Sequence, residues 1–107
     1  MLKIEKTRNT NDTASISSGI ALNTTTSVKI VDANPNRIFF YASNDGATDA
    51  VWVKLQAQSV DNDAKGIYLN KKGTSPNVWE MPSDNIYTGE ICAIADENNP
   101  NIYVTEY

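Results

Sequence analysis

An acidic stretch between Asp61 and Lys72 is the part of the sequence closest to a metal-binding motif. Asp61 and Asp63 place carboxylates at alternate positions, and Gly66 stands sixth, as in a calcium-binding loop. However, Lys65 occupies the fifth position and Lys72 the twelfth, where such a loop needs an oxygen ligand and a bidentate Glu. We therefore expect a solvated acidic loop here and no metal site.

The components of nucleophilic and acid–base catalysis are mostly missing from the chain. It contains no His, which excludes an imidazole base and a His-ligated metal. Cys92 is the single cysteine, so we expect a small buried apolar residue and no intrachain disulfide or zinc site. No carboxylate pair suggests an acid and base couple, no Gly-rich loop suggests a phosphate site, and Asp96 and Glu97 are expected to be solvated. The sequence therefore predicts a non-enzymatic protein with no catalytic residue and no cofactor.

Two tryptophans are the side chains best suited to binding. An aromatic ring on a strand face can stack on a sugar or anchor an interface, and Trp52 and Trp79 both lie in expected strands. Packing is the favoured interpretation for both. Trp52 is the better candidate for an exception, because its neighbours Val51 and Val53 occupy the inner face of the same strand.

Composition and charge indicate one small all-β domain. A chain of 107 residues suits a single core, and Asn, Thr and Ser supply 31 of them, which favours turns and half-exposed strands over helices. The net charge of −4 disfavours nucleic acid and anionic membranes, which both attract Lys and Arg. No apolar run approaches the ~20 residues of a membrane span, and the N-terminus lacks the apolar stretch of a signal peptide. We expect neither a nucleic-acid partner nor a membrane partner.

Short apolar runs separated by turn residues predict a single small antiparallel β-sandwich or jelly-roll-like domain over residues 18–107. Alternation assigns Val51, Val53 and Leu55 to the inner face of one strand, and Ile102 and Val104 to the inner face of the last. The eight expected strands are 19–23, 27–32, 37–44, 50–56, 66–70, 77–81, 89–95 and 101–106.

Two local signals lie beside the expected strand 37–44. Asp45 and Gly46 form an Asp-Gly pair, which predicts a tight hairpin turn leading into the strand 50–56. Arg37 directly follows the turn 34–36, so we expect it to bind carbonyls or a carboxylate across the end of the sandwich, in a structural role.

Residues 1–17 differ from the rest and are expected to form an extended N-terminal arm. The first eleven carry Lys3, Lys6 and Arg8 against Glu5, a charge of +2, so the remaining residues carry −6. The arm is either a frayed, solvated terminus or a segment that becomes ordered on a neighbouring subunit.

Several short motifs follow one another in a recognisable order. The strings Ala33-Asn34-Pro35-Asn36-Arg37 and Ser43-Asn44-Asp45-Gly46 precede a Val-rich strand, and Gly66-Ile67-Tyr68-Leu69, Tyr87-Thr88-Gly89-Glu90-Ile91 and Val104-Thr105-Glu106 follow it. Over residues 18–107 this layout resembles small β-sandwich proteins from the structural gene clusters of tailed bacteriophages, including capsid decoration (cement or staple) proteins. Similar layouts occur in phage fibre and accessory virion domains.

The resemblance implies a non-enzymatic decoration protein on the capsid surface of the virion. Such a protein binds the outer shell and bridges neighbouring subunits of the major capsid protein. We expect a homo-oligomer, dimer or trimer, because several weak contacts made together raise the apparent affinity. We expect the arm to supply positive charges that approach acidic residues of the shell, and apolar side chains that add contact area. The expected partner-binding residues are Leu2, Lys3, Ile4, Lys6, Arg8 and, on the body, Trp52.

A second hypothesis remains open at this point. The chain could be a receptor- or carbohydrate-binding module of a phage fibre or head protrusion. Trp52, Trp79 or an exposed Tyr would then be the platform on which a sugar stacks.

Overall fold

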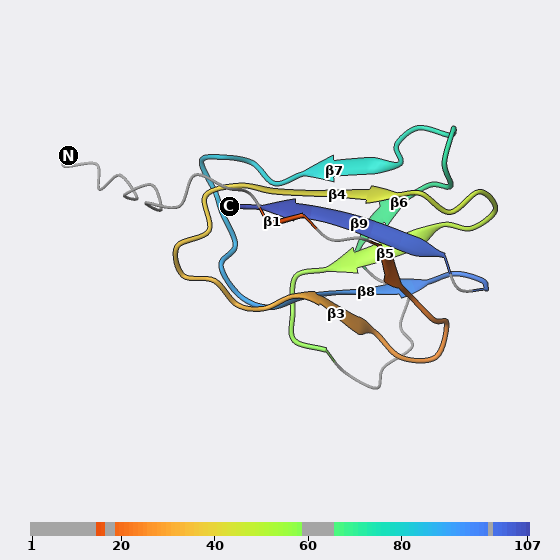
Figure 1. Ribbon diagram of the computed structural model, residues 1–107, viewed down its shortest axis with the longest axis horizontal. Helices are drawn as coiled ribbons and strands as arrows, with labels where there is room; N and C mark the ends of the chain where they lie inside the picture. Colours follow the sequence, from red (N-terminus) through yellow and green to blue (C-terminus); the bar gives the residue numbers. More distant parts are fainter. Residues whose placement is uncertain (1–14, 17–18, 59–65, 99) are drawn as a thin grey trace.

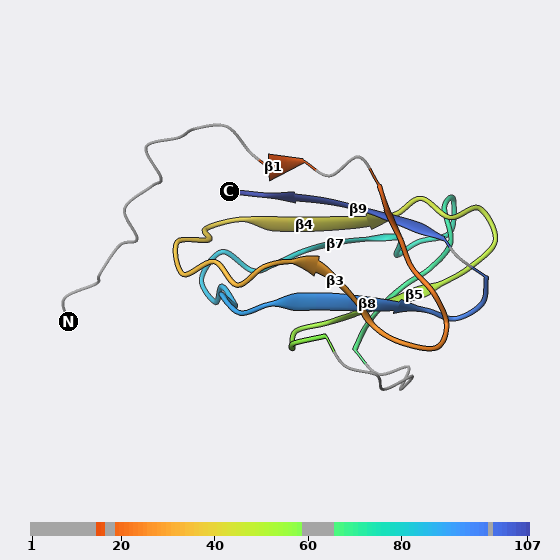
Figure 2. The ribbon, with the colours of Figure 1, turned by 60° about the horizontal axis from the view of Figure 1, so that its bottom comes forward.

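The computed structural model describes residues 15–16, 19–58, 66–98 and 100–107. All regular elements of this described part are β-strands, and they form two antiparallel sheets packed face to face (Figures 1 and 2). The all-β sandwich predicted from the sequence is confirmed, and each of the eight expected ranges contains one observed strand. The strands are β1 (Ser15–Ile16), β2 (Ile20–Ala21), β3 (Val28–Val31), β4 (Phe40–Asn44), β5 (Val51–Lys54), β6 (Ile67–Leu69), β7 (Val78–Glu80), β8 (Ile91–Ala95) and β9 (Asn101–Glu106).

The strand order is that of a jelly roll. Sheet A has the order β2-β9-β4-β7, with β1 also paired to β9, and sheet B has the order β3-β8-β5-β6. Strands β2 to β9 therefore pair as nested partners: β2 with β9, β3 with β8, β4 with β7 and β5 with β6. These nested pairs describe one long hairpin. The hairpin is rolled up, so that β9 also pairs with β4 and β8 also pairs with β5. The result is the double Greek key of a jelly roll.

The hairpin predicted at Asp45-Gly46 is wrong, because β4 and β5 lie in different sheets. The connection between them crosses from sheet A to sheet B, which lets the inner faces of both strands bury against each other. Gly46 is needed because its backbone lies close to Pro100, and not because of a hairpin. A Cβ at this position would lie 2.6 Å from Cβ of Pro100. An Asp-Gly pair marks a turn but does not say whether the next strand pairs with the one before it.

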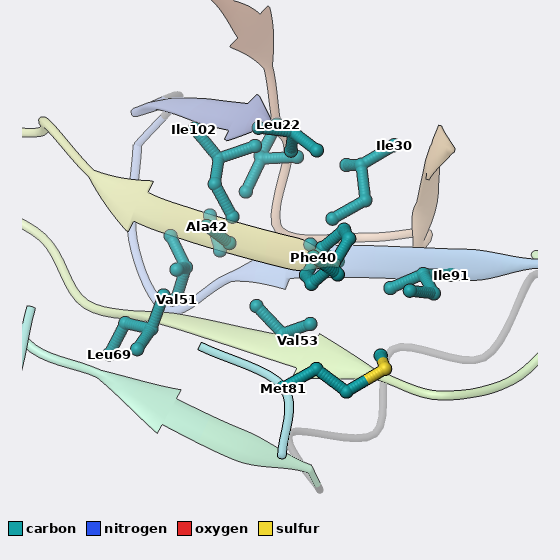
Figure 3. Packing of buried hydrophobic residues seen from close by; sticks show 13 residues of the cluster. Leu22, Ile30, Phe40, Ala42, Val51, Val53, Leu69, Met81, Ile91 and Ile102 are labelled. Atoms are coloured by element: carbon teal, nitrogen blue, oxygen red, sulfur yellow. The ribbon is translucent and has the colours of Figure 1, made fainter. Parts of the chain in front are cut away.

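A continuous apolar core fills the space between the sheets (Figure 3). Both inner faces contribute β-branched and aromatic side chains, as alternation predicts. The prediction that Leu55 lies on the inner face is wrong, because β5 ends at Lys54 and Leu55 is 38% exposed. The core residues are Leu22, Ile30, Phe40, Ala42, Val51, Val53, Leu69, Met81, Ile91, Ala93, Ala95, Ile102 and Val104.

Arg37 closes one end of the sandwich and is fully buried. Its Nε donates to the Glu106 carboxylate at 2.7 Å, and one terminal nitrogen donates to the carbonyls of Tyr87 (2.7 Å) and Gly89 (3.1 Å). The other terminal nitrogen donates to the carbonyl of Asp32 at 2.8 Å. One guanidinium therefore joins the ends of β3 and β9 to the segment that leads into β8, which is the structural role expected for it.

Asn44 performs the corresponding task at the opposite end and is also fully buried. Its Nδ2 donates to the carbonyls of Asp49 (2.7 Å) and Asn70 (2.9 Å), and its Oδ1 accepts from the backbone N–H of Gly46 (2.9 Å). One buried polar side chain thus lies shortly before β4 and another at its last residue, and each one satisfies backbone groups of neighbouring segments.

Replacing Arg37 should destabilise the fold strongly. We expect Arg37→Met to lower the free energy of unfolding by about 3 to 5 kcal/mol, because the partly buried Glu106 carboxylate and three carbonyls lose their donor. Urea denaturation followed by tryptophan fluorescence measures this change. Lys72→Met is the control: its 3.3 Å ion pair with Asp45 is exposed, and its loss should cost less than about 1 kcal/mol. Equal stability of the two variants would contradict the role given to Arg37.

Candidate functional site

Most of the predicted partner-binding residues lie outside the described residues. The loop 61–63, considered above as a metal site, also lies outside them. The predicted arm is described only at Ser15–Ile16, which form β1 and pair with Glu106 and Thr105 at the end of β9. The described part of the arm therefore lies at the end of sheet A that Arg37 closes. The predicted residues outside the described part are Leu2, Lys3, Ile4, Lys6 and Arg8.

Trp52 lies on the outer face of sheet B, as its alternation with Val51 and Val53 predicts. It is the middle member of a cross-strand row with Ile94 and Tyr68. The Trp52 and Tyr68 rings meet edge to face, with centroids 5.4 Å apart and an interplanar angle of 63°. Tyr68 is 44% exposed, so this pair presents aromatic surface to solvent.

Trp79 has the packing role that the sequence favoured for it. It lies opposite Ala42 in the pairing of β7 with β4, and it packs against the core. Its ring centroid is 6.0 Å from that of Phe40 at an angle of 57°. Trp79 is therefore a half-buried ring that contributes to packing.

The segment after β5 folds back over the outer face of β8. The Gln58 backbone N–H donates to the Glu90 carboxylate, and its side-chain oxygen accepts from the Lys29 backbone N–H at 3.1 Å. Beneath it lies Cys92, fully buried as expected, with its thiol 3.8 Å from the Ala57 carbonyl. At the edge of this sheet, a 2.7 Å hydrogen bond from Lys29 to Asp32, together with the Asp32 charge, raises the pKa of the Lys29 ammonium.

The outer face of sheet A carries an aromatic surface that the sequence analysis did not identify. The side chains of Tyr41 and Tyr103 alternate with buried neighbours and point outward. Phe39 and Tyr107 continue the same pairing, with rings stacked 4.9 Å apart at 16°. We call Phe39, Tyr41, Tyr103 and Tyr107 the aromatic face. Because Ile102 and Val104 were assigned to the inner face, alternation along the last strand already predicts that Tyr103 and Tyr107 lie on the outer face.

This aromatic face is continuous with the strand that joins the arm to the domain. In the register of β9, Thr105 pairs with Tyr41 on one side and with Ile16 of β1 on the other. Glu80, on β7, is the direct cross-strand partner of Tyr41, so one charged residue lies on the same face as the aromatic rings. The aromatic face and the attachment point of the basic arm therefore adjoin each other at one edge of the molecule.

No set of three or more His, Cys, Asp or Glu residues within the described ranges could hold a metal ion. The same ranges contain no helix long and apolar enough to cross a membrane. No family model, curated protein or solved structure matches the chain. The surfaces themselves therefore supply the evidence on function.

The two tryptophans should differ in their effect on stability. Trp79→Ala removes a ring packed on the core, and we expect the free energy of unfolding to fall by about 3 kcal/mol. Trp52→Ala removes a ring on an outer face, and we expect a loss of about 1 kcal/mol. Urea denaturation followed by circular dichroism measures both. A larger loss for Trp52 than for Trp79 would contradict the assignment of Trp79 to packing.

Proposed function

We propose that this protein is a non-enzymatic capsid decoration protein of a bacteriophage. It binds the outer shell of the virion and bridges neighbouring subunits of the major capsid protein. The observation that carries the proposal is the aromatic face of sheet A, together with its continuity with β1. The jelly-roll order is compatible with this role but does not decide it, because lectins and capsid domains share that architecture.

The aromatic face consists of four half-buried rings, and aromatic residues are typical of an interface core. Aromatic residues are enriched at protein interfaces and charged residues are depleted there, because large rings bury much area with little loss of conformational entropy. Three of its members, Tyr41, Tyr103 and Tyr107, also carry a hydroxyl that can bind polar groups at the rim. A shell subunit is the occupant that we assign to this face.

The arm supplies the second contact. Its first eleven residues carry a charge of +2, whereas the rest of the chain carries −6. Lys3, Lys6 and Arg8 would approach acidic residues of a neighbouring shell subunit, and Leu2 and Ile4 would add apolar area. Two weak contacts on different subunits raise the apparent affinity through effective concentration, and an expected dimer or trimer multiplies this effect.

Deleting residues 1–11 should abolish capsid binding and leave the fold intact. The described core runs from Leu22 to Val104, so the deletion removes none of it. Co-sedimentation with purified shells lacking this protein measures binding, and thermal denaturation measures the fold. Undiminished binding of the truncated protein would remove the arm from the proposal.

A substitution on the aromatic face tests the other contact. We expect Tyr41→Thr to weaken shell binding by about tenfold, because it removes a central ring while keeping a residue that suits a strand. The matched control is Tyr68→Thr, which removes a partly exposed tyrosine beside Trp52 on sheet B. Because we assign docking to sheet A and not to Trp52, the residue expected from the sequence, this variant should leave shell binding unchanged. Equal binding by both variants would show that sheet A is not the docking face.

A further inference from the structure

The strand β7 leaves one side of its backbone open at the edge of sheet A. It is the last strand in the order of that sheet and the uppermost strand in Figure 1, and β4 is its strand partner within the described residues. On the side facing β4, the Asn77 carbonyl accepts a hydrogen bond from β4 and the Met81 N–H donates one to it. Because successive residues of a strand direct their backbone groups to opposite sides, those of Val78 and Glu80 face away from β4.

Val78 and Glu80 therefore offer two donors and two acceptors to a further strand. No backbone hydrogen bond within the described part of the chain uses these four groups, and Val78 is 41% exposed. The edge strand β3 of sheet B differs, because the Lys29 N–H donates to the Gln58 side chain and the Lys29 ammonium pairs with Asp32. Charges and caps of this kind keep other strands away. Of these two edges, β7 is the one that can accept another strand.

Two prolines set the length of the open edge. Pro76 and Pro82 lie just outside β7, at positions whose backbone would face the same way as that of Val78 and Glu80. Neither proline has an N–H to donate. Pairing along this edge is thereby confined to the short strand itself, so the edge does not support pairing with a long strand. A strand of the same length, bounded in the same way, fits it: the β7 of a second copy.

One antiparallel register of two copies uses all the open groups. When Trp79 lies at the two-fold axis, Val78 of each copy is opposite Glu80 of the other, and each such pair exchanges two hydrogen bonds. A register centred on Glu80 places two like charges opposite each other and pairs Val78 with Pro82. A register centred on Val78 pairs Glu80 with Pro76. Both alternatives lose hydrogen bonds, and the first also adds charge repulsion.

The same register brings the two Trp79 rings together. Each ring is half-buried and packs against Phe40 in its own core, with centroids 6.0 Å apart. At the axis, Trp79 would form a pair without backbone hydrogen bonds, in which the two Cα atoms lie only about 4.5 Å apart and side chains approach closely. Aromatic cross-strand pairs are among the stabilising ones, and a partly buried Trp at the centre of an interface is typical of a hot spot.

We propose that two copies of this chain pair through β7 in this register, which joins their A sheets into one continuous sheet. Residues opposite each other in a ladder share a face, so both aromatic faces then lie on the same side of the joined sheet. The two β1 strands lie toward its far edges. Two docking faces on one side would raise the apparent affinity for a shell, and this consequence rests on the proposed function. The pairing itself does not.

Sedimentation velocity of the isolated full chain tests the pairing without any shell. The chain is examined between about 10 µM and 1 mM, a range set by the weak association expected of a small interface. We expect a monomer–dimer equilibrium with a Kd on the order of 100 µM, because two such short strands bury less area than the interface of a stable dimer. No species larger than a dimer should form, since the pairing uses up the open edge.

Variants at position 78 test the interface and its register. Val78→Pro removes a donor on the open side while keeping the hydrogen bonds to β4, and should weaken dimerisation at least tenfold. In the proposed register residue 78 faces Glu80 of the other copy, so Val78→Lys should strengthen dimerisation about threefold at low salt, and Val78→Glu should weaken it by about as much. Leu55→Lys is the control: it changes an exposed apolar residue outside β7 and should dimerise like the parent.

Three results would overturn the pairing. The first is a monomer at every concentration, and the second is a trimer, which has no two-fold contact. The third is a dimer that neither Val78→Pro nor Val78→Glu weakens. If Val78→Pro fails to fold, the comparison of Val78→Lys with Val78→Glu still decides, because equal weakening by both charges contradicts the register. A monomeric chain that binds shells would reject the pairing and leave the aromatic face as the docking surface.

Discussion

The buried guanidinium of Arg37 is the interaction on which the rest of the structure depends. In a jelly roll, successive strands cross between sheets, so the ends of the sandwich hold many chain segments whose carbonyls face no strand partner. Arg37 satisfies three such carbonyls and the Glu106 carboxylate at one end. Asn44 does the same for the carbonyls of Asp49 and Asn70 at the other end. Because Arg37 lies shortly before β4 and Asn44 is its last residue, this strand connects the two closed ends.

The same arrangement separates the surfaces that the molecule offers to others. At the Arg37 end, Glu106 also pairs with Ser15, so the attachment point of the arm is fixed beside the aromatic face. At the Asn44 end, the buried amide joins the chain segments that contain Asp49 and Asn70. The two ends of the sandwich therefore present different surfaces, with β1 and the aromatic face at one end and polar side chains at the other.

Local patterns predicted the strands well, because each one alternates or is strongly β-prone and is bounded by turn residues. The structural role of Arg37 was also predicted correctly, because a cation directly after a turn can reach backbone carbonyls that have no strand partner. The hairpin at Asp45-Gly46 was wrong because pairing depends on which sheet a strand joins. The Phe39–Tyr107 stack could not be predicted from the sequence, because the two residues are brought together only by the rolled topology.

The copy number of this chain in purified virions tests the proposed decoration role most directly. A protein that bridges neighbouring shell subunits must be present in numbers of the same order as the major capsid protein, because each bridge repeats with the symmetry of the shell. Quantitative mass spectrometry of gradient-purified particles gives that ratio. A ratio of the same order supports decoration. A few copies per particle would indicate a tail or fibre role, and absence from the particle would contradict any place in the virion.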